Sequence, residues 1–313
     1  MGWERALPTS AARKRRSLSL RAKEAIAGYL FISPWLIGFL VFVLGAMIAS
    51  LGISLYETNL LNTTEFVGLK NYQSVFRDRL FWKALSVTSY YTFTVVPLQT
   101  IAALLMAMLL NQRLKGQGVF RTIYYLPAVV SSVATISVWW WMLNPDSGLI
   151  NAALARIGIA PGPRWLVSPR WALPAVIMMG VWGSGGSMLI FLGALQGVPR
   201  ELYEAAMLDG ATAVRRFFNV TLPMISPTIF FSIVMGLIGA FQIFSEAYLM
   251  TQGGPNNATL TYVLLIYRKT FEHLRFGYGS ALAWILFLIL MFFTLLVFKS
   301  SEVWVYYETE LRK

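Results

Sequence analysis

The chain has 313 residues, of which 57% are hydrophobic and 13% are charged, and its mean hydropathy is +0.61. Soluble domains average about 45–50% apolar and about 25% charged residues, so this composition excludes an ordinary water-soluble protein. The net charge of +12 forms no Lys/Arg-rich stripe, which argues against a nucleic-acid partner. The absence of cysteine and the single histidine, His273, exclude disulfides, thiolate chemistry and a multi-histidine metal site, so most parts of a catalytic centre are missing.

Six apolar runs follow one another along the chain. Each one reaches or approaches the roughly 20 residues that an α-helix needs to cross the bilayer, and none alternates as the strands of a membrane barrel do. The sequence therefore predicts an all-α membrane protein with a six-helix domain at 28–298, an N-terminal tail at 1–27 and a C-terminal tail at 299–313. The predicted transmembrane helices are 28–53, 86–110, 122–143, 171–195, 223–250 and 280–298.

The orientation of these helices follows from their basic flanks. Lys and Arg gather in the tail 1–27, the loops 111–121 and 196–222 and the tail 299–313, whereas the other three loops carry fewer of them over longer stretches. Because cytoplasmic loops are enriched in these residues, both termini are predicted to lie in the cytoplasm, and the loop 196–222 with them.

The loop 196–222 has the features of two short helices joined at a glycine. Pro199 suits the first turn of a helix, where its missing N–H is not needed, and Glu201 and Glu204 suit the positive end of the helix dipole. Gly210 suits a helix C-terminus because it adopts the left-handed conformation cheaply. A second short helix is expected over 211–219, which gives a helix–glycine–helix elbow on the cytoplasmic face.

Polar residues inside the apolar runs predict a solute pathway, since lipid offers such groups no partner. In the fifth run they recur every three or four residues, which places them on one helical face. Two other interpretations stay open: small residues also permit close helix packing, and Glu246 can sit at the wet outer boundary. The glycines of the fourth run are expected to allow close helix approach or local unwinding, and Pro97 and Pro127 to kink their helices. The predicted pathway residues are Gln99, Trp182, Ser184, Ser187, Gln242, Ser245 and Glu246.

The elbow resembles the EAA loop of ABC-importer permeases. A Glu-Ala-Ala triplet at 204–206 is followed four residues later by Gly210, and the loop ends in Leu222-Pro223, just before the penultimate helix. In that family the loop is the coupling helix, which inserts into a cleft on the ATP-hydrolysing subunit. The resemblance implies an ATPase-coupling role for Glu204, Ala205, Ala206, Asp209, Gly210, Ala211, Arg215, Phe217, Leu222 and Pro223.

The resemblance extends from about Tyr29 to Phe298, and the outer loops carry motifs similar to the carbohydrate branch of these permeases. That branch includes permeases for maltose, trehalose, other oligosaccharides and glycerol 3-phosphate. The chain departs from it at Ala46, where many members have proline, and at Val87, where asparagine is frequent. The resemblance implies a type I ABC-importer permease fold in a bacterial or archaeal inner membrane. The motifs are 68–72 with 81–82, 148–151 with 165–166, 251–255 with 267–268, and 277–281.

The missing parts indicate which partners the chain needs. It has no Gly-x-x-x-x-Gly-Lys-Ser/Thr motif, so ATP and Mg²⁺ belong to separate subunits, and this chain is a non-catalytic permease with no cofactor of its own. It also lacks an internal repeat, so a second permease subunit is expected to supply the other half of the pathway. The resemblance further implies two ATP-binding subunits, an extracytoplasmic solute-binding protein and a carbohydrate substrate that moves by alternating access.

Two alternatives from other classes remain. An ion-coupled secondary transporter would use intramembrane carboxylates, of which the spans contain only Glu246, with no cation beside it in a span. A channel or membrane-embedded enzyme would need a filter motif or convergent catalytic groups. Neither alternative needs the elbow, which therefore favours the ABC permease.

Overall fold

The computed structural model describes residues 19–59, 64–112 and 115–306. Within them the chain is helical apart from one small sheet, and it divides into two compact units, residues 1–52 and 53–313. Part of the predicted tail 1–27, with the basic run Arg13–Arg16, lies outside the described residues. So do Arg113, Arg312 and Lys313 from the other basic segments.

The first unit is a continuous helical segment that begins before the apolar run. Its first helix starts at Leu20 because the Ser19 side chain caps it, accepting a hydrogen bond from the Ala22 amide at 3.3 Å. No residue of α1 is buried in the described structure, as expected for a helix that faces lipid. The elements are α1 (Leu20–Gly38), the π-helical η1 (Phe39–Leu44) and α2 (Gly45–Ser54).

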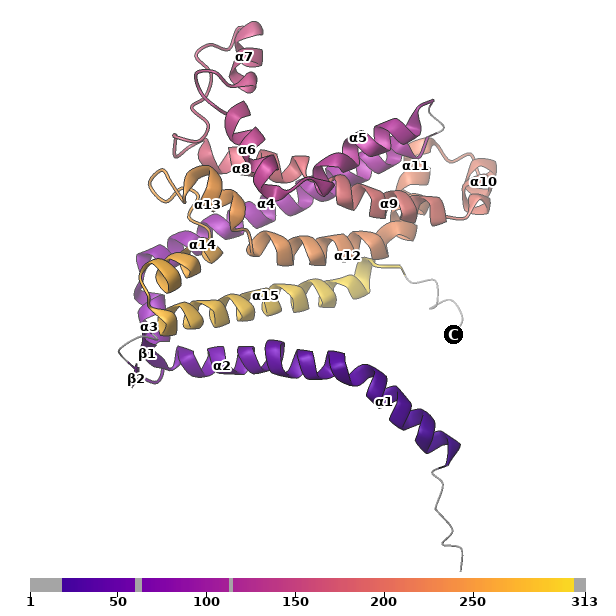
Figure 1. The fold of residues 1–313 in the computed structure, drawn as a ribbon. Coiled ribbons are helices and arrows are strands. Elements are labelled where there is room, and N and C mark those ends of the chain that lie inside the picture. The colour runs from indigo at the N-terminus through magenta and orange to yellow at the C-terminus, as the bar shows by residue number, and fades with distance from the viewer. Residues whose placement is uncertain (1–18, 60–63, 113–114, 307–313) are drawn as a thin grey trace, which may run out of the picture. The chain divides into compact units, whose positions relative to one another are not determined.

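The second unit is built around a long central helix, α4 (Arg79–Leu110), which packs against α8, α9 and α12. Figure 1 shows α12 and α15 running side by side along the same layer, and the two elements are in contact. The other long elements are α12 (Leu222–Phe241), α15 (Phe276–Trp304), α5 (Gln117–Val129), α6 (Ser132–Met142), α8 (Ala172–Trp182) and α9 (Gly185–Gly197).

Among the described residues, four helices are long and apolar enough to cross a membrane: Leu20–Ser54, Arg79–Leu110, Ala213–Phe241 and Phe276–Trp304. Two bent pairs raise the number to six if each pair forms one span. The predicted transmembrane helices 122–143 and 171–195 are each interrupted. The first is broken into α5 and α6, which meet at 100°, and the second into α8 and α9, which meet at 41°.

Each break has a local cause. Pro127 lies close to the end of α5 and removes an amide hydrogen from the last turn, after which Val130 and Ser131 adopt extended backbone. At the second break, Gly185 lies so close to α5 that a Cβ atom there would be 2.1 Å from the Tyr124 carbonyl oxygen. The expectations for Pro127 and for close approach at Gly185 are thus confirmed, whereas α4 continues as one helix through Pro97.

The predicted fifth helix, 223–250, is also broken, because α12 ends at Phe241 and α13 (Ser245–Thr251) starts after a non-helical turn. Phe241 and Ile243 are both buried, but they belong to two different apolar cores. The single polar face expected along this run therefore ends at the turn.

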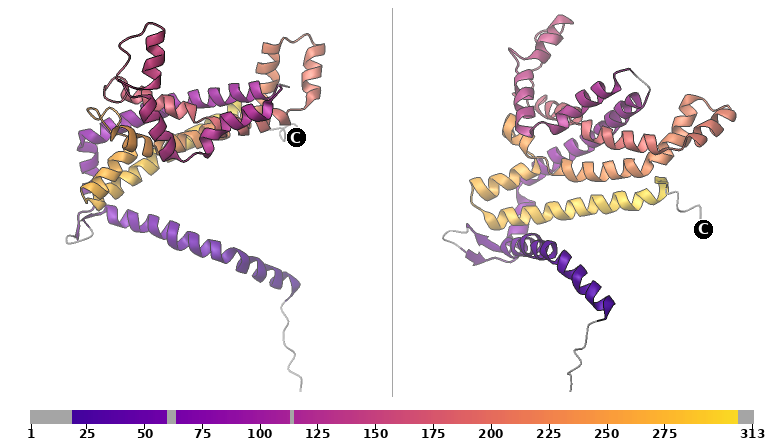
Figure 2. Two further views of the ribbon diagram at one scale, coloured as in Figure 1. Left: turned by 45° about the horizontal axis from the view of Figure 1, so that its top comes forward. Right: turned by 45° about the vertical axis from the view of Figure 1, so that its right-hand side comes forward.

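One end of the second unit carries short elements that the sequence did not reveal (Figure 2). One small sheet interrupts the otherwise helical fold here, because strands β1 and β2 form an antiparallel pair with Tyr56 opposite Phe66. Asn71 fixes this hairpin by donating to the carbonyl oxygens of Ser54 and Tyr56, both at 2.9 Å. The elements are β1 (Tyr56–Thr58), β2 (Thr64–Phe66), α3 (Lys70–Arg77), α7 (Leu149–Arg156), α14 (Tyr262–Tyr267) and η3 (Arg268–Glu272).

The start of α4 is tied to the start of α15 by a charged cluster at the same end. Asp78 caps α4 by accepting from the Leu80 amide at 2.8 Å. Its other oxygen lies 3.0 Å from Lys269 Nζ and accepts from the Tyr278 hydroxyl at 3.0 Å. Burial alone would raise the pKa of Asp78, but these hydrogen bonds outweigh it and hold the pKa below its usual value.

Candidate functional site

The elbow lies at the opposite end of the second unit (Figure 1). It consists of α10 (Arg200–Leu208), α11 (Ala213–Arg216) and the π-helical η2 (Phe217–Thr221). Pro199 is the residue before α10 and not part of its first turn, and Glu201 occupies that turn. The extended backbone of Pro199 directs the chain out of α9 and away from the helix bundle.

The glycine of the elbow ends α10 as predicted. Gly210 has φ +74°, its amide donates to Met207, and the Ala211 amide donates to the Ala206 carbonyl oxygen at 2.9 Å. These two hydrogen bonds make a Schellman motif, in which the residue after the helix must be left-handed. The spacing between Ala206, Gly210 and Ala211 is therefore explained by the geometry of one helix end.

The second helix of the elbow runs on into α12, contrary to the expectation that it ends near Asn219. Leu222 donates to Phe217 five residues back, so the helix widens to a π-turn before Pro223, which has no amide hydrogen to donate. Thr212 starts α11 by accepting from the Arg215 amide. Tyr203 joins α10 to the same rod, its hydroxyl oxygen 2.9 Å from that of Thr221.

The outward face of the elbow is apolar and uncovered. Leu208 is 89% exposed, Val214 67% and Phe218 57%. Apolar side chains gathered at an exposed tip mark a surface that another protein covers. Of the predicted coupling residues, Glu204, Ala205, Asp209, Gly210 and Arg215 are exposed, whereas Ala206, Ala211, Phe217, Leu222 and Pro223 are partly buried.

A cavity of about 660 Å³ lies between the helices of the second unit. Its walls come from α4, α5, α6, α8, α9, α12 and α13, so the helix breaks at 130–131, 183–184 and 242–244 all border it. Six of the seven predicted pathway residues line it: Gln99, Trp182, Ser187, Gln242, Ser245 and Glu246. Ser184 does not, because it is fully buried beside the break.

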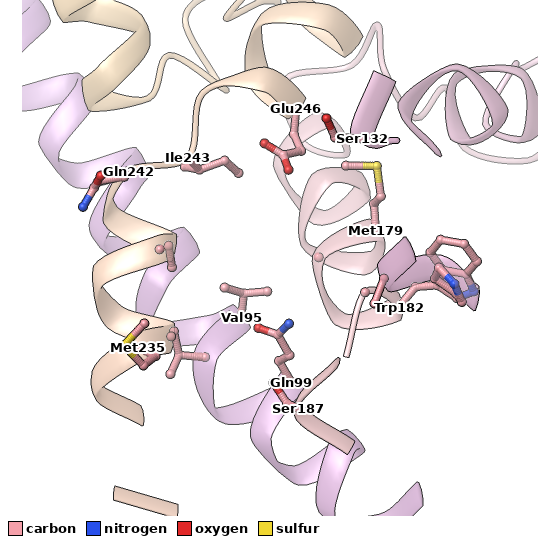
Figure 3. A pocket seen from close by; sticks show the side chains of 18 of the residues that line it. Val95, Gln99, Ser132, Met179, Trp182, Ser187, Met235, Gln242, Ile243 and Glu246 are labelled. Carbon is pink, nitrogen blue, oxygen red and sulfur yellow. The ribbon is translucent and has the colours of Figure 1, made fainter. Parts of the chain in front are cut away.

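Figure 3 shows how the polar side chains lie in this cavity. Gln99 and Ser187 lie close together at one end, and the Glu246 carboxylate points into the space at the other end, near Ser132. The Gln242 side chain points away from Glu246. Glu246 thus joins the cavity from α13, beyond the turn, and not from a helical face shared with Gln242.

Sequence reasoning missed several lining residues, including Ser132 and Thr135 of α6 and Tyr91 of α4. Helix α6 starts at Ser132, after the break that follows Val130. The sequence offered one signal for this polar lining, a pair of uncharged polar residues at 131–132 inside an apolar run. Within the described residues, no three His, Cys, Asp or Glu side chains come together to hold a metal ion.

The comparisons with known proteins identify the family. Residues 99–302 match the model of the binding-protein-dependent transport system inner membrane component. The chain belongs to this family. It is 40% identical over 299 residues to the probable ABC transporter permease protein YesP of Bacillus subtilis, covering 95% of this chain and 96% of that protein. It is 36% identical to the trehalose/maltose transport system permease protein MalF of Thermococcus litoralis, over 90% of this chain and 96% of that protein.

The fold of the family is also that of solved structures. A chain of a bacterial ABC transporter involved in the import of the acidic polysaccharide alginate aligns with a TM-score of 0.78 and 24% identity, over 90% of this chain and 96% of that chain. The resemblance seen in the sequence is therefore confirmed at the level of family and fold. This chain is an inner-membrane permease component, and the family does not favour the ion-coupled alternative.

Proposed function

We propose that this chain is the membrane-spanning permease subunit of an ATP-driven importer, which receives a carbohydrate from a solute-binding protein and passes it to the cytoplasm by alternating access. The cavity carries this proposal. Its amide and hydroxyl groups, from Gln99, Thr100 and Ser187 among others, suit the many hydroxyls of a sugar, and Trp182 offers an aromatic face. Relatives named for lactose, at 37% identity, and for trehalose/maltose support a sugar substrate.

The partners follow from what the chain carries and what it lacks. Two ATP-binding subunits hold ATP and Mg²⁺, and one of them receives the elbow through residues 204–223. A second permease subunit completes the pathway, and the binding protein docks on the outer face. The exposed apolar tip at Leu208, Val214 and Phe218 supports the docking of a subunit at the elbow. A solved ABC transporter in complex with a pentasaccharide-bound periplasmic protein, whose chain shares this fold, supports the outer partner.

The topology of the proposed subunit has six spans within 28–298, with the bent pairs α5–α6 and α8–α9 each counted as one. Both tails, 1–27 and 299–313, and the elbow lie in the cytoplasm. The positions of α10 and of the α14–η3 segment at opposite ends of the second unit support this assignment, because the elbow and the outer loops then face opposite sides of the membrane.

Co-purification tests the assembly directly. The tagged chain is extracted in mild detergent and its companions are identified by mass spectrometry. We expect an ATP-binding subunit and a second multi-span chain, with the ATP-binding subunit lost in Leu208→Asp, since a charge there is buried without a partner on docking. Ile157→Asp is the matched control, because Ile157 is 72% exposed but follows α7, far along the chain from the elbow. A complex that keeps its ATP-binding subunit in Leu208→Asp contradicts the proposed coupling surface.

A further inference from the structure

We propose that this chain's half of the pathway favours uncharged carbohydrates over anionic ones, and that Glu246 is the residue that sets the preference. The inference rests on the proposed function, since it concerns solutes that enter the same cavity. It goes further by naming the charge class of the solute, which family membership leaves open: relatives of this chain are named for lactose and also for sn-glycerol 3-phosphate.

The lining of the cavity carries one carboxylate and no cation. Among the described residues that border it, Glu246 is the only acid, and none is Lys, Arg or His. The remaining polar groups are uncharged. Such groups both donate and accept hydrogen bonds, which matches neutral sugar hydroxyls, whereas a phosphate or carboxylate is bound most strongly by positively charged donors, which this lining lacks. The uncharged polar lining residues are Tyr91, Gln99, Thr100, Ser132, Thr135, Ser187, Ser232, Gln242 and Ser245.

The charge of Glu246 is not cancelled by a neighbour. The ion pairs of the described structure join Lys70 with Glu57, Arg268 with Glu272 and Lys269 with Asp78, and none of them includes Glu246. Its side chain is half-buried and, as Figure 3 shows, it points into the cavity. The cavity therefore presents one uncompensated negative charge to whatever enters it.

A cavity with low-dielectric walls strengthens this effect. Apolar walls focus the electric field of a charge that lies among them. Near a negative charge the local concentration of anionic solutes therefore falls and that of cations rises. Val95, Val96 and Met179 supply such walls here.

The cysteine-free sequence gives a direct test. A single cysteine is placed in the assembled complex as Ser132→Cys, near Glu246 in Figure 3, or as Ser187→Cys, near Gln99. Each variant is treated with a cationic, an anionic and a neutral methanethiosulfonate of similar size. The modification rate of this chain is followed by mass spectrometry, which separates it from any cysteine of a partner subunit.

We expect the ratio of the cationic to the anionic rate to fall about tenfold when Glu246→Gln is added to Ser132→Cys, the effect of one charge at close range in a partly hydrated site. The fall is smaller at Ser187→Cys, which lies at the other end of the cavity. Glu246→Asp keeps the charge and is expected to keep most of the ratio. Glu65→Gln is the matched control, since it removes an exposed carboxylate on β2 outside the cavity.

The outcomes separate this inference from the function on which it rests. Modification of neither cysteine by the neutral reagent overturns the aqueous pathway, and with it the proposed function at this cavity. Modification by the neutral reagent with a ratio unchanged by Glu246→Gln overturns only the charge preference. A ratio that falls equally in Glu65→Gln also overturns it, because the effect then comes from overall charge and not from Glu246.

Discussion

The hydroxyl groups of Tyr203 and Thr221 lie 2.9 Å apart and join α10 to the helical rod that becomes α12. Tyr203 also packs against the apolar core formed by Phe191, Leu195 and Ile225. This is the one side-chain hydrogen bond between α10 and η2 among those found in the described residues, so it fixes how the elbow is held against the bundle.

Replacing Tyr203 by phenylalanine is expected to loosen the elbow while keeping its packing. Loss of one such hydrogen bond costs about 1 kcal/mol. We expect a lower ratio of solute transported to ATP hydrolysed in reconstituted vesicles, with the complex still assembled. Tyr29→Phe, at an exposed position in α1, is the control. An unchanged ratio in Tyr203→Phe means that the hydrogen bond does not hold the elbow.

Replacing Gly210 by alanine is expected to disturb the end of α10, because φ is +74° there and a left-handed residue with a Cβ atom costs about 1–2 kcal/mol. The expected result is weaker retention of the ATP-binding subunit during purification. Gly197→Ala serves as the control, since it has open space around it and does not require positive φ. Equal retention of the ATP-binding subunit in both variants contradicts the requirement for glycine at the end of α10.

Replacing Gly185 by alanine is expected to separate α9 from α5. The added Cβ meets the Tyr124 carbonyl oxygen at 2.1 Å, and overpacking of this kind costs about 1–3 kcal/mol. The melting temperature of the purified complex is then expected to fall. Gly193→Ala lies on the same helix with nothing within 4 Å and is expected to leave the melting temperature unchanged. Similar values for the two variants refute the close contact.

The Asp78 cluster predicts an acid-sensitive contribution to stability. Because its pKa is lowered in the folded chain, the contribution is present above the usual carboxyl value, about 3.9, and is lost as the pH falls through the lower folded value. Asp78→Asn is expected to lower the melting temperature at pH 7 by the equivalent of about 1 kcal/mol or less, and this difference from the wild type is expected to shrink as the pH is lowered below the usual carboxyl value. Asp146→Asn, at an exposed loop position, controls for loss of charge alone. A difference that does not shrink as the pH is lowered contradicts the assignment.

Two cavity residues predict effects on uptake. Gln99→Ala and Trp182→Ala are each expected to raise the half-saturating solute concentration about fivefold, the equivalent of about 1 kcal/mol of lost contact. Trp140→Ala is the matched control, because Trp140 is 53% exposed on α6 and does not line the cavity. Uptake is measured with radiolabelled sugar in whole cells. Equal uptake in all three variants and the wild type removes these residues from the pathway.

The sequence was most informative where structure is local. Gly210 was predicted correctly because a helix end depends on a few adjacent residues and on the φ of one of them. Glu246 was placed among the lining residues for an incomplete reason: the face argument assumed a continuous helix, whereas α12 ends at Phe241 and α13 begins at Ser245. Ser184 was predicted to line the cavity, but the break beside it turns its side chain into the protein.

The features that the sequence could not reveal depend on contacts between distant segments. Asn71 holds the β-hairpin by bonds to Ser54 and Tyr56, and no period in the sequence signals it. Thr88 accepts a hydrogen bond from the amide of Tyr262, 174 residues further along the chain, and so supports α14 and not the cavity. Such pairings emerge only when the helices are packed.

The unbroken passage from α11 through η2 into α12 makes the elbow and the cavity wall parts of a single lever. The segment Ala213–Phe241 has 29 residues, which at a rise of about 1.5 Å each gives an arm of roughly 43 Å. If its elbow end is the pivot, a tilt of about 5° swings the far end by roughly 4 Å, close to the diameter of the α-helix backbone. The turn at 242–244 lies at that far end, where a joint absorbs the displacement and Glu246 follows it on the other side.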